Sequence, residues 1–193
     1  MVVVAASVLG VPVADARPAF LAVVGVHVVA GLVAVLAGAG AARIRKASGW
    51  HPWVGRVYLG ALGVVAATAA VLAVLRWPHD LHLLMLGGVA VGLAGMGWRA
   101  RRRARPGWWR GHIVGMGGSY VVLLTAFYVD NGPRLPGWDR LPVAVLWVLP
   151  MLVGAPLIGW ALLRHRRAVL TPARPVPPRM PELPAPPARR DRG

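Results

Sequence analysis

The chain has no cysteine and only six acidic residues among its 193 residues. Without cysteine it can form neither a disulfide nor a thiolate-ligated metal site. Charged residues make up 15% of the chain, whereas soluble domains usually carry about a quarter. No acidic residue falls inside a long apolar run, so a carrier that moves protons through an intramembrane Asp or Glu is not expected. The sequence also lacks a phosphate-binding loop, an HExxH motif and a nucleophile–base pair, so it indicates no enzyme class.

The sequence does contain five apolar blocks, each about as long as a helix that crosses a ~30 Å hydrocarbon core. They cover residues 19–41, 53–75, 81–98, 112–129 and 141–163. None of them alternates as a barrel strand does, and a helix satisfies all its backbone polar groups internally, as lipid requires. We therefore predict an all-α integral membrane bundle of five transmembrane helices within residues 18–167.

The basic residues are concentrated on one side of this arrangement. They lie in the links between blocks one and two and between blocks three and four, and after block five. Because positive charge is retained in the cytoplasm, we predict an inner-membrane protein with its N-terminus outside and its C-terminus in the cytoplasm. The stretch RARRRARPGWWR at 99–110 would indicate nucleic acid in a soluble protein. In this setting it predicts a loop that contacts anionic lipid headgroups, and no nucleic-acid partner is expected.

The two ends of the chain differ from the apolar blocks. Residues 1–17 are apolar but too short to span, and Ala14-Asp15-Ala16 resembles a signal-peptide cleavage site without a preceding basic residue. This segment is predicted to be either a cleaved signal segment or an extension lying on the membrane. Residues 168–193 are rich in proline and arginine, and they predict a disordered cytoplasmic tail.

Four histidines lie in or at the ends of the spans, where polar groups are costly and tend to be functional. His27 lies about nine residues, or ~13 Å, from the outer end of its span, and His82 about four residues, or ~6 Å. His51 and His112 open the second and fourth spans at the inner boundary. The four histidines therefore predict an outer pair and an inner pair.

This alternation is what a di-haem cytochrome of the b type needs, because each haem iron takes two axial imidazoles from facing helices. The predicted iron ligands are His27 with His82 and His51 with His112. Arg56 lies beyond His51 and is a candidate partner for a haem propionate. Glycines beside these histidines would make room for a flat porphyrin. The resulting hypothesis is a haem b protein that transfers electrons across or within the membrane.

Other interpretations of the same residues stay open. Small residues at helical spacing are the ordinary way in which transmembrane helices pack, and histidines at a span end also contact headgroups. The main alternative is a non-catalytic membrane subunit or scaffold whose histidines are structural. A metal other than haem is a further alternative. A solute permease has little support because mid-membrane polar residues are scarce.

The segments HPWVGRVYLG (51–60) and GHIVGMGGSYVVLLTAFYVDNGPRLPGW (111–138) resemble an uncharacterised family of bacterial multi-pass membrane proteins. The resemblance extends over about residues 20 to 165 and includes a His-x-x-x-Gly-Arg-x-Tyr motif. The matching positions are His27, His51, Gly55, Arg56, Tyr58, His112, Ser119 and Tyr120. The chain has Pro52 where family members often have a basic residue. The resemblance implies the membrane fold but no activity, and a likeness to transmembrane di-haem cytochromes b is only an analogy.

Overall fold

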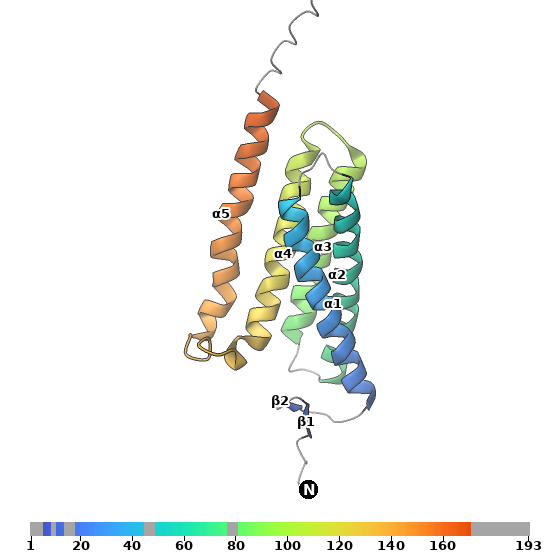
Figure 1. Ribbon diagram of the computed structural model, residues 1–193, viewed down its shortest axis with the longest axis vertical. Helices are drawn as coiled ribbons and strands as arrows, with labels where there is room; N and C mark the ends of the chain where they lie inside the picture. The colour runs from blue at the N-terminus through green and yellow to red at the C-terminus, as the bar shows by residue number, and fades with distance from the viewer. Residues whose placement is uncertain (1–5, 9–10, 14–17, 45–48, 77–80, 171–193) are drawn as a thin grey trace, which may run out of the picture.

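The computed structural model describes residues 6–8, 11–13, 18–44, 49–76 and 81–170. Five long helices run alternately up and down through the molecule (Figure 1). They are α1 (Pro18–Arg43), α2 (Trp50–Leu75), α3 (Leu81–Arg103), α4 (Trp108–Asn131) and α5 (Val143–Leu170). All five are long and apolar enough to cross a membrane, which confirms the predicted helical bundle of a multi-pass membrane protein.

Three short elements accompany the helices. The strands β1 (Ala6–Val8) and β2 (Val11–Val13) pair antiparallel ahead of α1, within the predicted N-terminal extension. The 3-10 helix η1 (Gly132–Arg134) follows α4 directly. The rest of residues 1–17, and the predicted tail from residue 171 onward, lie outside the described residues.

The helices extend further at their basic ends than the apolar blocks predicted. The helix α3 continues through Arg103 and α4 already begins at Trp108, so only four residues join them. Arginines in the last turn suit the helix because its C-terminal end carries partial negative charge. The turn is made by Ala104 (φ 47°) and Gly107 (φ 77°), which both take the left-handed conformation. The helix α5 likewise runs to Leu170, three residues beyond the predicted boundary of the tail at 167.

The up-and-down order brings the basic ends of α1, α3 and α5 to the same end of the bundle, opposite β1 and β2 (Figure 1). This basic end holds the α3–α4 turn and the start of α2. The opposite end, called the N-terminal end below, holds the start of α1 and the connection between α4 and α5. The charge of the described residues is therefore unevenly divided along the bundle axis, as the sequence predicted.

The core of the bundle lies among α1 to α4, which pack in a ring, while α5 lies against α4. Four of the seven buried residues in the central cluster are alanines, namely Ala34, Ala37, Ala90 and Ala94. Small residues let helices approach closely, as is usual between helices in a membrane. Many large apolar side chains point outward, including those of α1 and α5, which suits a surface covered by lipid.

Candidate functional site

The two histidines of the predicted inner pair lie together at the basic end of the bundle. His51 opens α2 and His112 stands in the first turns of α4, and their ring centroids are 6.3 Å apart with an interplanar angle of 74°. The ring of Trp108, one turn before His112, is 5.9 Å from the His112 ring. The helices α2 and α4 both start at this end of the ring of four, so their first turns meet across it.

Each histidine of the inner pair also forms a hydrogen bond with the helix that precedes its own. The Nδ1–H of His51 donates to the carbonyl oxygen of Ala41 in α1 at 3.0 Å. The Nδ1–H of His112 donates to the carbonyl oxygen of Gly97 in α3 at 3.2 Å. Because a carbonyl can only accept, both imidazoles carry a proton on Nδ1, and in the neutral form the lone pair is on Nε2.

His27 is tied to α2. Its Nδ1 lies 2.8 Å from the hydroxyl oxygen of Thr68, and that hydroxyl lies 2.8 Å from the carbonyl oxygen of Val64. A hydroxyl has a single proton, so Thr68 donates it to the helix backbone and accepts from the Nδ1–H of His27. The bond therefore joins α1 to α2 toward the N-terminal end of the bundle.

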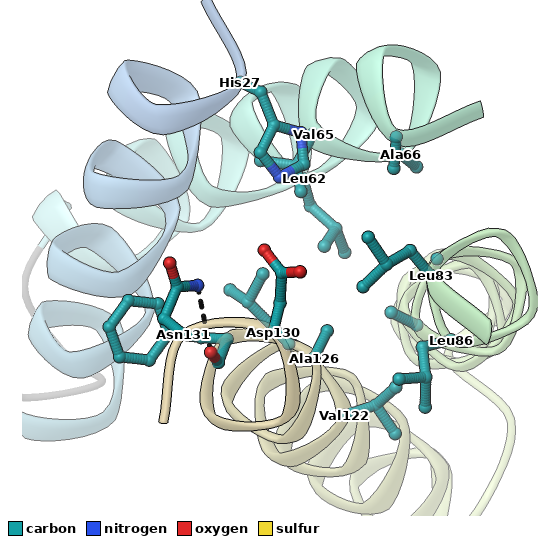
Figure 2. A pocket seen from close by; sticks show the side chains of 15 residues that line it. His27, Leu62, Val65, Ala66, Leu83, Leu86, Val122, Ala126, Asp130 and Asn131 are labelled. Atoms are coloured by element: carbon teal, nitrogen blue, oxygen red, sulfur yellow. Dashed lines mark hydrogen bonds between the residues drawn. The ribbon is translucent and has the colours of Figure 1, made fainter. Parts of the chain in front are cut away.

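A small cavity of about 70 Å³ opens beside His27, between α2, α3 and α4 (Figure 2). The side chains of His27 and Asp130 point into it, and leucines, valines and alanines make up most of the remaining wall. Ligand pockets usually measure about 300–1,000 Å³, so this cavity is far too small for a porphyrin. It has room for a few water molecules, each of which needs at least ~10–15 Å³.

His82 does not line this cavity, and the structure does not bring the rings of His27 and His82 into contact. The ring of His82 lies 6.3 Å from that of Trp147 in α5. Of the two predicted pairs, the structure therefore brings together the inner one and not the outer one.

The other residues proposed for haem binding are Arg56 and the glycines beside the histidines. Arg56 is exposed on α2. Gly115 packs against α3 so closely that a Cβ on it would lie 2.5 Å from the backbone nitrogen of Gly97. A Cβ on Gly111 would lie 3.0 Å from Cβ of Ala100, again in α3. These glycines bring α3 and α4 together and leave no porphyrin-sized space between them.

The tyrosines of the two motifs form a polar network inside the core. The hydroxyl of Tyr58 lies 2.8 Å from that of Ser119, and Tyr120 donates to the carbonyl oxygen of Val35 in α1 at 3.1 Å. The Tyr58 and Tyr120 rings are 6.2 Å apart. Gly38 in α1 makes room for them, because a Cβ there would collide with the ring of Tyr120.

Sequence reasoning missed Asp130 and Thr68. The predicted fourth block ends at Val129, so the expectation that no carboxylate belongs to a span is wrong. The helix α4 continues to Asn131, which places Asp130 one and two turns from Ala126 and Val122 on the cavity side. Continuing the helical period of α4 by one turn would have found it.

No family model matches this chain, and neither does any curated protein or any solved structure. The resemblance based on the His-x-x-x-Gly-Arg-x-Tyr motif therefore stays a prediction.

Proposed function

We propose that this chain is a non-catalytic subunit or scaffold of a bacterial inner membrane, in which the histidines join helices. The observation that carries the proposal is the set of hydrogen bonds from His27, His51 and His112, each of which ends on a neighbouring helix. The close packing of α3 on α4 at Gly115 supports it too, because a porphyrin would need that space.

The N-terminus lies outside and the C-terminus in the cytoplasm, since the basic end is retained on the cytoplasmic side.

A second candidate is a single b-type haem on the inner pair. The 6.3 Å between the ring centroids of His51 and His112 favours it. His51 and His112 would hold the haem iron through Nε2. Metal-ligating histidines commonly donate their other ring N–H to a carbonyl, as both of these do. Such a haem would supply one-electron transfer, and the outer pair has no comparable geometry.

Purification in detergent from haem-replete cells, followed by reduced-minus-oxidised absorbance, separates the two candidates. A scaffold gives a folded and colourless protein. Sharp b-type bands that are lost in His112→Ala but kept in His165→Ala would contradict the scaffold function and support the haem protein. His165 is the matched control because its ring lies 4.7 Å from that of Trp109 at the same end of the bundle but outside the inner pair.

A further inference from the structure

An open groove of about 550 Å³ runs along α3 toward its basic end. Its lining residues are Val91, Gly92, Gly95, Met96, Arg99, Ala100 and Arg103. Residues three or four apart share one face of a helix, so apolar residues form the floor of the groove and two arginines stand at one end of it. All of these residues belong to α3, and Ala100 lies at the edge of the groove where α3 packs on α4.

The floor of the groove is not filled by any other part of the described chain. A Cβ built on Gly92 or Gly95 would meet nothing within 4 Å, and the same holds for Gly88 one turn further. Gly97, by contrast, packs against the backbone of α4, where a Cβ would lie 2.9 Å from the nitrogen of Met116. Packing within the described chain therefore accounts for Gly97 but not for the glycines of the groove.

The arginines at the end of α3 fall into two kinds. Arg101 and Arg102 lie over the rings of Trp108 and Trp98, at 4.6 and 4.7 Å from the ring centroids. Arg99 and Arg103 are exposed and have no hydrogen bond, ion pair or ring contact within the part of the chain that the structure describes. Guanidinium groups bind phosphate oxygens with two parallel hydrogen bonds. The end of the groove is thus suited to a phosphate group.

We propose that this groove binds one anionic diacyl phospholipid, with its phosphate at Arg99 and Arg103 and an acyl chain over Gly95 and Gly92. The stretch from Val91 to Arg103 rises ~18 Å at 1.5 Å per residue. Half of a ~30 Å hydrocarbon core is ~15 Å, so the groove matches one leaflet together with its headgroup region. Basic pockets of membrane proteins recognise such headgroups at the cytoplasmic surface. The inference rests on the proposed membrane location and is independent of the role of the histidines.

Native mass spectrometry of the full chain in detergent tests the proposal, with dioleoyl phosphatidylglycerol and dioleoyl phosphatidylcholine as probes. We expect one phosphatidylglycerol to bind tightly and phosphatidylcholine not to displace it. The double variant Arg99→Gln/Arg103→Gln should weaken that binding on the order of 25-fold, from roughly fivefold per arginine near an anionic headgroup. Arg101→Gln/Arg102→Gln is the matched control, because it removes the same charge from the same turn of α3. It should leave the affinity within about twofold, since these two guanidinium groups lie over the rings of Trp108 and Trp98 and outside the groove.

Equal losses in the two double variants would overturn the proposal, because they would mean that the whole basic turn attracts lipid without a specific site. Gly92→Leu is the second variant: it fills the groove, leaves both arginines in place, and meets open space. It should release phosphatidylglycerol while the protein stays folded. If Gly92→Leu instead abolishes a dimer and leaves lipid binding unchanged, a second copy occupies the groove and the proposal is wrong. The absorbance of the same samples is a separate test, since haem bands would overturn the scaffold function without affecting the lipid result.

Discussion

The phenol oxygen of Tyr58 and the hydroxyl oxygen of Ser119 lie 2.8 Å apart in the interior of the bundle, and both residues are almost completely buried. Ser119 lies 2.8 Å from the carbonyl oxygen of Met116 and donates to it. Since a hydroxyl has one proton, Tyr58 donates to Ser119. The bond joins α2 to α4 diagonally across the ring of four helices, and it satisfies the buried hydroxyl of Tyr58.

Removing either end of this bond should have unequal effects. In Tyr58→Phe, Ser119 still donates to Met116, so we expect a loss of about 1 kcal/mol in the free energy of unfolding. In Ser119→Ala, the hydroxyl of Tyr58 is left buried without this acceptor, and we expect a loss of about 2 kcal/mol. Denaturant titration in detergent measures both values. A larger loss in Tyr58→Phe than in Ser119→Ala would contradict the assigned direction of the bond.

The contact between α3 and α4 predicts a difference between two glycines. In Gly115→Ala the new Cβ would lie 2.5 Å from the backbone nitrogen of Gly97, and backbone cannot move aside as a flexible side chain can. We expect a loss of about 1–3 kcal/mol in the free energy of unfolding. Gly88→Ala is the matched control, because its Cβ meets nothing within 4 Å. The control should be neutral or slightly stabilised, and equal losses in the two variants would mean that α3 and α4 are not packed at Gly115.

The bond between His27 and Thr68 predicts a modest structural role for the histidine. Thr68→Val removes the acceptor of the His27 Nδ1–H and should lower the free energy of unfolding by about 1 kcal/mol, as is usual for a hydrogen bond between membrane helices. Thr125→Val is the control, because among the described residues the hydroxyl of Thr125 bonds within α4 alone, to the carbonyl oxygen of Val121 at 3.0 Å. If Thr68→Val is as stable as the wild type while Thr125→Val is destabilised, His27 does not join α1 to α2.

The orientation can be measured directly because the chain contains no cysteine. Arg105 in the α3–α4 turn and Asp139 in the connection to α5 are both exposed, at opposite ends of the bundle. With the basic end in the cytoplasm, a membrane-impermeant maleimide added to intact cells should label Asp139→Cys and not Arg105→Cys. Both variants should react once the membrane is made permeable. The reverse labelling pattern would require the opposite topology.

The five spans were predictable because apolar length alone selects a membrane helix. Their ends were less predictable. The run of arginines from Arg101 to Arg103 is as polar as a loop, yet it continues α3, since hydropathy does not report the backbone conformation. The predicted fourth block likewise ends at Val129, two residues before the end of α4, and so leaves Asp130 outside the span.

The depth of each candidate histidine along its helix was predictable from the sequence, but the neighbouring helix that its side chain faces was not. His51 and His112 both stand in the first turns of helices that begin at the same end, so depth alone was enough to pair them. His27 and His82 lie at different depths on α1 and α3, and each turns to another helix, α2 and α5 respectively. The rotation of a helix about its axis is set by tertiary contacts such as Gly38 against Tyr120, and these join residues far apart in the sequence.

The carbonyl acceptors of His51 and His112 have a consequence for assembly. Ala41 precedes His51 by 10 residues, and Gly97 precedes His112 by 15, so each bond closes within one pair of consecutive helices. The hydrogen bond within each pair, α1–α2 and α3–α4, can therefore form as soon as both helices of that pair are in the bilayer. The bond from Tyr58 to Ser119 joins these two hairpins, and α5 packs along α4 at the outside of the ring.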